Sequence, residues 1–437
     1  MPVDHPVVAE DQRLRRDADR PGDRGARDLY QKRPPVPARS AGVAAPHMRT
    51  WTRLGACAAA IAALAGCATQ TSSTVTVSGT SLTIYASNPP GVPGSQDVLD
   101  AERLALKQAG SSAGSFTLRF VSLSQKPSDN ARTAIQDSKA VAYLGELSPG
   151  DSSGTLGITN DQDLLQVTPT DTAIALTQSS PAVQGAPNNY YEQLKTYGRT
   201  FARVVPSGVA EARAQASQMR TLGVRKLYVA DDGSDYGKAI ANAVSQDAST
   251  DGITVTHGSA SASAVSASGA DALFYGAAAG ARATAQTLFG AVNEGQNPRL
   301  KLFAPSALDS SSLASSLAST KAQLYVSEPG FLSSSLSKAA KQQFTSPFEA
   351  AYGHAPSPEA IFGYEAMSAV LAVLREAGSQ ANNRSRVVHD FFAIKNRPSV
   401  VGTYSINSQG DTSISPFVFS RLVRGTLVPY KFVQASP

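Results

Sequence analysis

Cysteine, histidine and charged residues are all scarce in this chain of 437 residues. It has 2 Cys and 5 His, and 17% of its residues are Asp, Glu, Lys or Arg. No cysteine follows Cys67, so disulfide bonds cannot stabilise the folded part. His257, His354 and His389 are far apart and have no Cys or His near them at metal-ligand spacing. We therefore expect no metal site and no cofactor.

Aromatic residues and basic patches are also sparse. Aromatics make up 7% of the chain, and residues 1–66 hold 11 of the 39 Lys and Arg, although the whole chain carries a formal charge of +5. The remainder has 28 basic and 27 acidic residues. Without a basic block there, nucleic acid is not expected as a partner. No apolar run after the N-terminal leader is long enough to span a membrane.

The first 80 residues divide into three segments. Residues 1–47 alternate Arg and Asp without apolar periodicity, which predicts a disordered leader or a start assigned too early, with Met48 as the working start. Residues 48–66 combine two arginines with a short apolar run and are typical of a secretory signal. Residues 67–80 are rich in Ser and Thr and predict a flexible tether. The sequence Leu-Ala-Gly-Cys ending at Cys67 resembles a bacterial lipobox, which implies cleavage before Cys67 and a diacylglycerol on its thiol. The alternative is an ordinary signal peptide with an incidental cysteine.

The rest of the chain is rich in alternating strand and helix patterns. Short apolar segments at 81–85, 116–123, 140–144 and 164–167 are separated by helical patterns, which predicts βαβ units and a parallel sheet. After the Pro-Ser-Gly break at 206–208 the winding starts again, with strands expected at 226–230, 253–256, 272–275, 300–303 and 323–327. We expect two α/β lobes with hinge crossings: residues 81–205 plus 330–405, and residues 206–329. Residues 406–437 are expected as strands near the hinge.

Two further segments are less regular. The polar turn at 407–411 predicts a hairpin between residues 400–406 and 416–422. Residues 178–199 contain three tyrosines and two prolines fall within 173–199, so we interpret this stretch as an insertion near the ligand mouth or a loop packed on one lobe.

The segment at 225–240 is a candidate for the binding site because it reads as strand, loop and helix. In an open α/β sheet, ligands bind outside the carboxyl ends of the strands, at the tips of such loops. Tyr236 lies at that tip and is a candidate binding group. The alternative is that residues 231–235 cap the helix and Tyr236 packs at its base.

Three segments together resemble the type I periplasmic substrate-binding proteins of branched-chain amino acid importers. They are residues 141–177, with Thr-Pro-Thr-Asp-Thr at 168–172; residues 206–237, with Asp-Asp-Gly-Ser-Asp-Tyr-Gly; and residues 270–305, with Phe-Tyr-Gly and Phe-Ala-Pro. The resemblance implies a monomeric, lipid-anchored, extracytoplasmic protein without enzymatic activity. It further implies that the protein holds a small molecule between two lobes and delivers it to the permease subunits of an ABC transporter.

The resemblance also implies a set of ligand-binding residues. In this family, hydroxyl and backbone N–H groups of a Ser loop and a Thr-Pro loop hold the carboxylate of an amino-acid ligand, and neutral donors at such sites suit an anion. The residues implied here are Ser152, Ser153, Thr170, Thr172, Tyr236, Tyr275 and Ser306.

The chain departs from the family pattern at two acidic positions. Ser306 stands where an acidic residue usually meets the ligand's ammonium group, and Gly208 where the hinge often has Asp. A buried ammonium group would then need Asp151, Asp171 or Asp309 as its counter-ion. A neutral or acidic ligand, such as an amide, a carboxylate or an aromatic acid, fits as well.

Enzyme motifs are weak in this sequence. Ser335 and Lys338 match Ser-x-x-Lys, and residues 128–130 match Ser-Asp-Asn, but their order is reversed relative to the penicillin-recognising enzymes. We therefore expect a binding protein. The alternative is a lipoprotein sensor or protein-interaction module with the same fold, which the Ala-Ala-Ala run at 277–279 favours slightly.

Overall fold

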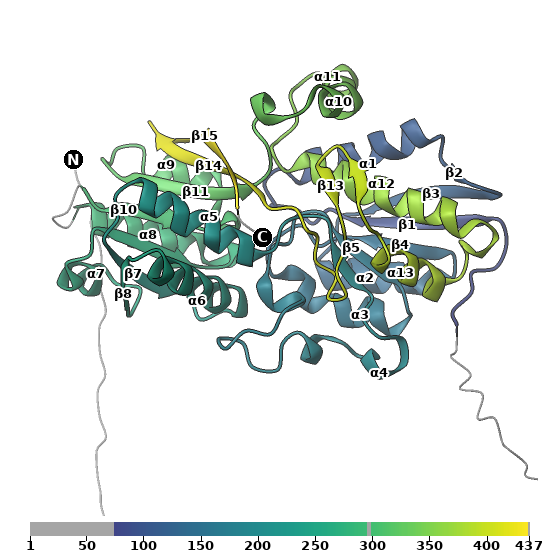
Figure 1. Ribbon diagram of the computed structural model, residues 1–437, viewed down its shortest axis with the longest axis horizontal. Coiled ribbons are helices and arrows are strands. Elements are labelled where there is room, and N and C mark those ends of the chain that lie inside the picture. The colour runs from purple at the N-terminus through teal and green to yellow at the C-terminus, as the bar shows by residue number, and fades with distance from the viewer. Residues whose placement is uncertain (1–73, 295–298, 436–437) are drawn as a thin grey trace, which may run out of the picture. The chain divides into compact units, whose positions relative to one another are not determined.

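The first lobe is built on a six-stranded sheet (Figure 1). The computed structural model describes residues 74–294 and 299–435, which belong to one compact unit, Gln70–Pro437. The strands lie in the order β2 (Ser112–Ala113), β3 (Phe116–Leu123), β1 (Ser81–Ser87), β4 (Ala140–Leu144), β5 (Leu165–Thr168) and β6 (Phe201–Arg203). All neighbouring pairs are parallel except β2 with β3. Strands β4 and β5 are fully buried, as expected for central parallel strands covered on both faces.

Helices from two distant parts of the chain cover this sheet. The first set is α1 (Ser95–Ala109), α2 (Pro127–Gln136) and α3 (Leu156–Asp161), and the later set includes α12 (Ala360–Ala377) and α13 (Arg384–Phe392). Helix α12 is apolar almost all round and is buried against α1, and α13 lies beside it (Figure 1). The segment from α10 (Lys338–Ala340) through the π-turn at Lys341–Thr345 to α11 (Ser346–Tyr352) also packs on this core.

The second lobe is built on a seven-stranded sheet. Its strands lie in the order β15 (Thr426–Gln434), β14 (Pro416–Val423), β11 (Gln323–Pro329), β10 (Lys301–Ala304), β9 (Ala272–Gly276), β7 (Lys226–Asp231) and β8 (Thr254–His257). The strands from β11 to β8 are parallel, whereas β14 and β15 are antiparallel to their neighbours. The helices of this lobe are α5 (Gly208–Thr221), α6 (Asp235–Thr250), α7 (Ala262–Ser268), α8 (Arg282–Glu294) and α9 (Ser311–Ser316).

Side-chain caps fix where several of these helices begin. The Ser234 hydroxyl accepts a hydrogen bond from the Gly237 N–H at the start of α6, and the Ser310 hydroxyl accepts one from the Leu313 N–H at the start of α9. Such caps satisfy N–H groups that have no partner inside the helix. They hold the loops at the carboxyl ends of the strands in fixed positions.

The turn expected at 407–411 is present and closes an antiparallel bridge between Ile406 and Thr412, but the expected pairing of residues 400–406 with 416–422 is wrong. The structure instead pairs β12 (Arg397–Ser399) with β13 (Gly402–Tyr404), and β14 with β15 around a tight turn at Arg424 and Gly425. Both turn residues have positive φ, 50° and 79°, which suits a two-residue hairpin loop. Residues 416–434 therefore extend the second sheet along β11.

The insertion expected at 178–199 contains two short helical turns, η3 (Asn188–Tyr190) and α4 (Leu194–Tyr197), and an isolated β-bridge between Ser180 and Val183. A third short turn, η2 (Ile174–Leu176), lies just before it. The segment packs into the same apolar core as α5 and α6 of the second lobe, and the Tyr190 hydroxyl donates to Asp235 at 2.9 Å.

The expected fold class is confirmed: two mostly parallel sheets, each flanked by helices, form a two-lobed α/β protein. The proposed boundaries between the lobes stay predictions. Within the part of the chain that the structure describes, no helix is long and apolar enough to cross a membrane.

Candidate functional site

A cavity of about 230 Å³ lies between the two lobes. Its first wall comes from the loops that follow β1, β4 and β5 and from the segment before α12, and includes Thr170 and Glu359. Its second wall comes from the start of α8, the turn after β10 and the strands β11, β14 and β15, and includes Arg282 and Ser306. Carboxyl ends of parallel strands thus meet from both sides, where ligands of open α/β sheets bind.

The expected ligand hydroxyls on the first lobe are largely engaged inside the protein. The Thr170 hydroxyl donates to the Leu147 carbonyl at 2.6 Å, and the Ser153 hydroxyl donates to the Gly150 carbonyl at 2.7 Å. The Ser152 hydroxyl accepts a hydrogen bond from the Glu146 N–H of the same loop at 3.1 Å and is fully buried. Of these three side chains, Thr170 lines the cavity.

The backbone N–H groups of the same loops meet the carboxylate of Asp171. The N–H groups of Gly150, Ser152 and Ala173 donate to Asp171 at 2.7, 2.9 and 3.0 Å. Burial raises the pKa of Asp171, and these three hydrogen bonds together with nearby Arg203 oppose that rise. A protein carboxylate therefore occupies donors that could otherwise hold an anionic ligand.

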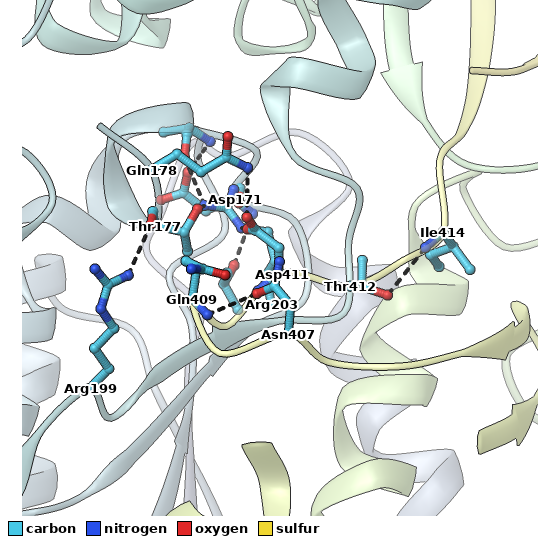
Figure 2. Close-up of polar contacts among 12 residues, drawn as sticks. Asp171, Thr177, Gln178, Arg199, Arg203, Asn407, Gln409, Asp411, Thr412 and Ile414 are labelled. Carbon is cyan, nitrogen blue, oxygen red and sulfur yellow. Dashed lines mark hydrogen bonds and ion pairs between the residues drawn. The ribbon is translucent and has the colours of Figure 1, made fainter. Parts of the chain in front are cut away.

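Arg203 fixes the Thr-Pro loop from behind (Figure 2). This fully buried guanidinium donates to the carbonyls of Asp171 and Ala173 at 3.0 and 2.8 Å and pairs with Asp411 at 2.9 Å. Asp411 also accepts a hydrogen bond from Gln178 at 2.7 Å. The turn at 407–411, expected to close a hairpin, thus anchors the loop of the candidate site.

Glu211 joins the two lobes and was not expected from the sequence. It lies in the first turn of α5, is fully buried, and accepts hydrogen bonds from the Ser327 hydroxyl and the Ser306 N–H, both at 2.6 Å. The hydroxyls of Ser306 and Thr172 lie 3.2 and 3.4 Å from the same carboxylate. Burial raises the pKa of Glu211, and these hydrogen bonds lower it in part. Thr172 and Ser306 are therefore brought together as predicted, 3.4 Å apart, but around a protein carboxylate.

Gly208 permits this close approach. A side-chain carbon at position 208 would lie 2.9 Å from Ile174 and 3.0 Å from the carbonyl of Thr172, and the Gly208 N–H donates to that carbonyl at 2.6 Å. An aspartate could not fit there without moving the loop. The departure from the family pattern at 208 thus has a steric reason.

Tyr236 lies in the apolar core that the 173–191 segment shares with α5 and α6, and is 5% exposed. Its Cβ would come within 3.3 Å of a side chain at Gly150 of the first lobe, so the two lobes touch here. The Tyr236 hydroxyl is buried near Thr172 and Ser306, yet it does not reach hydrogen-bond geometry with any described residue. Burial, followed by the charge of Glu211, raises its pKa well above the ordinary value. Tyr236 does not line the cavity.

Tyr275 lies away from the other candidate residues. It is 1% exposed in the apolar core between the second sheet and α8, where it packs edge-on against Phe289 with ring centroids 6.3 Å apart. Because strand β9 is buried on both faces, the period-2 pattern of its sequence did not show which face Tyr275 takes.

Four ionisable side chains line the cavity: Asp309, Glu328, Glu359 and Arg282. Burial raises the pKa of Asp309 to about 6 and that of Glu359 to about 8, and the nearby charge of Asp309 adds to the rise at Glu359. Burial also raises the pKa of Glu328, with Asp309 and Glu359 adding to the shift. Of the counter-ions considered from the sequence, Asp309 is the one on the cavity wall. Glu328 and Glu359 were missed because neither follows a recognisable loop motif.

A model of the family described as periplasmic binding protein matches residues 125–424. The chain belongs to this family. A comparison with curated proteins finds no match. Among solved structures, a leucine-binding protein from Thermotoga maritima is similar at 18% identity and a TM-score of 0.66, covering 82% of this chain and 99% of that one.

Two other solved structures show how widely relatives of this fold differ in ligand. A branched-chain amino acid transporter binding protein from Streptococcus pneumoniae, in complex with isoleucine, has 13% identity and a TM-score of 0.62, covering 81% of this chain and 99% of that one. A solute-binding protein from R. palustris, in complex with benzoate, has 15% identity and a TM-score of 0.61, covering 81% and 97%. At these identities the similarity establishes the fold.

Membership of the periplasmic binding protein family confirms the resemblance seen in the sequence and places the protein outside the cytoplasm. Of the named relatives, the R. palustris protein is a solute-binding protein of an ABC transporter, and the S. pneumoniae protein is a substrate-binding protein of a branched-chain amino acid transporter. The predictions for Met48, Cys67 and the leader fall outside the described residues.

Proposed function

We propose that this periplasmic binding protein captures a small organic solute in its interlobe cavity and delivers it to the permease subunits of an ABC importer. The observation that carries the proposal is the cavity itself, which both lobes line with loops at the carboxyl ends of their strands. Its volume of about 230 Å³ lies below the usual range for ligand pockets, which begins at about 300 Å³, and this favours a small ligand. The protein acts as a binding protein and not as an enzyme.

The proposal includes the lipid anchor and a monomeric state. The lipobox-like sequence ending at Cys67 supports attachment to the outer face of the cell membrane through a diacylglycerol. Mass spectrometry of membrane-extracted protein should find an acylated N-terminal Cys67. A soluble mature form that begins at another residue would contradict the anchor without affecting the solute site.

The alternative is a sensor or protein-interaction module, and one observation favours it. The hydroxyl and N–H groups expected to hold a ligand are largely engaged within the protein, by Asp171, Glu211 and nearby carbonyls. A protein that uses this fold without a solute could fill its cleft in this way. The cavity beyond Thr170 and Ser306 remains open, which favours solute binding.

A thermal-shift screen of small amino acids, amides, carboxylates and amines would test the proposal. A ligand at a hundredfold excess over its Kd stabilises the folded state by about 2.7 kcal/mol, which raises the melting temperature measurably. The variant Val92→Trp should abolish the shift, because Val92 lines the cavity on a loop. Val428→Trp, at a valine that is 39% exposed on β15, is the matched control. Absence of any shift across the panel would favour the interaction module.

A further inference from the structure

The carboxylate-binding donors of the first lobe are already occupied. Asp171 accepts hydrogen bonds from three backbone N–H groups, two of them in the loop expected to bind the ligand. The Thr170 hydroxyl donates to a carbonyl, and Thr172 lies within reach of Glu211. An amino-acid or aromatic-acid carboxylate would have to displace Asp171, a fully buried group held by Arg203 and the backbone.

The cavity itself is acidic. Three carboxylates, those of Asp309, Glu328 and Glu359, line it against one guanidinium, that of Arg282. Within residues 74–294 and 299–435, no hydrogen bond or ion pair engages these three carboxylates. Arg282 donates to the Ala307 carbonyl at 3.0 Å. Unpaired carboxylates in a partly buried cavity are costly, and a ligand cation would offset that cost.

We propose that the cavity binds an organic cation that lacks a carboxylate, such as a small amine or guanidinium compound. This inference rests on the proposed solute-binding function and narrows its ligand class. With all three carboxyls ionised, an anionic ligand would meet an excess of two negative charges among the lining side chains. A metal ion is a poorer match, because the described residues contain no group of three His, Cys, Asp or Glu placed to hold one.

Because the carboxyl groups that line the cavity ionise, cation binding should depend on pH. The pKa of Glu359 is raised to about 8 by burial and by Asp309 and Asp97, and the pKa of Asp309 is raised to about 6 by burial, with Arg282 opposing. Glu328 faces both of these acids. A bound cation favours the charged carboxylates, so binding releases protons and tightens as pH rises. Each proton released steepens the affinity by up to about tenfold per pH unit.

Three compounds that share an isobutyl group separate the possible ligand charges. They are isoamylamine, leucine and isocaproate, with putrescine as a second cation, each tested against the full mature chain by thermal shift and titration calorimetry. We expect one or both amines to raise the melting temperature, and leucine and isocaproate to leave it unchanged. Binding of leucine or isocaproate without either amine would overturn the charge inference but support the proposed function. Absence of binding by these compounds and by the wider solute panel would contradict both.

Neutral variants locate the cation. Glu359→Gln and Glu328→Gln should each weaken amine binding at least about tenfold and reduce the protons released, measured by calorimetry in two buffers of different ionisation heat. Glu349→Gln, at an exposed glutamate on α11 outside the cavity, is the matched control and should change neither quantity. A variant that fails to fold is recognised by its melting curve without ligand. If one of the two cavity variants fails to fold, the other alone tests the inference. Equal amine affinity and proton release in wild type and both cavity variants would overturn the inference.

Discussion

Glu211 and Glu359 both lie between the lobes, Glu211 fully buried and Glu359 half-buried, but their surroundings are opposite. Glu211 accepts hydrogen bonds from a backbone N–H and from hydroxyls on both lobes. Glu359 has other acids near it and no hydrogen-bond donor among the described residues. A carboxylate that accepts its hydrogen bonds from the protein stabilises the fold. A carboxylate without such donors gains more from binding an external cation. The same side chain is thus structural on one side of the interface and available for ligand on the other.

Among the carboxylates, removal of Glu211, whose hydrogen-bond donors are in place, should have the largest effect. Glu211→Ala leaves the Ser306 N–H and the Ser327 hydroxyl without their acceptor and opens a cavity at the lobe contact. We expect a loss of about 3 kcal/mol in the free energy of unfolding, measured by urea denaturation. Glu211→Gln keeps the shape and one acceptor oxygen and should lose less. Stability within about 0.5 kcal/mol of wild type for Glu211→Ala would remove the structural half of the comparison.

Asp171, like Glu211, is a buried carboxylate whose hydrogen-bond donors are in place, and it gives a second test of the comparison. Asp171→Ala frees the N–H groups of Gly150, Ser152 and Ala173 beside Arg203, and should cost about 2 kcal/mol of stability. The freed N–H groups should then bind a small anion by donating hydrogen bonds to it. Formate should raise the melting temperature of Asp171→Ala and leave wild type unchanged. If formate stabilised both proteins equally, its effect would be a general salt effect.

The fold followed from the sequence because its signals are local and repeated. Apolar strand segments such as 140–144 and 272–275 alternate with helical patterns, and this alternation suffices for a parallel α/β architecture. The pairing of the C-terminal strands did not follow, because the polar turn at 407–411 closes only a bridge between Ile406 and Thr412, and its Asp411 pairs with Arg203. The Arg-Gly turn at 424–425 was the available signal for the true hairpin.

The candidate site could be predicted from the sequence only in part, because a family resemblance identifies residue positions but not the groups to which their side chains hydrogen-bond. Thr172 and Ser306 do meet across the lobes. Glu211 was hidden because an acidic residue in the first turn of a helix is ordinary capping chemistry. Glu328 and Glu359 come from a strand end and a helix start far apart in sequence. Only the folded chain brings their side chains to one cavity.

Carboxylates without hydrogen-bond donors, such as that of Glu359, should make the stability of the unliganded protein depend on pH. The pKa of Glu359 is raised to about 8 in the folded state from an ordinary 4.5, so the folded protein holds a proton that the unfolded chain releases. Its contribution is present at low pH and is lost as pH rises from about 5 through 8, by at most about 1.4 kcal/mol per unit. Glu359→Gln should flatten this decline and be more stable than wild type at pH 8. A wild-type stability that rises over this range would contradict the unpaired state of the cavity acids.

The smallest expected effect is that of removing the hydroxyl of Tyr236, which is buried like Glu211 but, like Glu359, lacks a hydrogen-bond partner in the part of the chain that the structure describes. Its ring is buried in the shared core, but its hydroxyl reaches no hydrogen-bond partner among the described residues. Tyr236→Phe should therefore change the unfolding free energy by less than about 0.5 kcal/mol or raise it slightly, because no hydrogen bond is lost and a buried polar group is removed. Tyr236→Ala should cost about 3 to 5 kcal/mol through the cavity it leaves. Both are measured by urea denaturation without ligand. A loss above about 1 kcal/mol for Tyr236→Phe would show that the hydroxyl is hydrogen-bonded in solution, with Thr172 or Ser306 as its partner, and would place Tyr236 with Glu211 among the groups whose hydrogen bonds are satisfied.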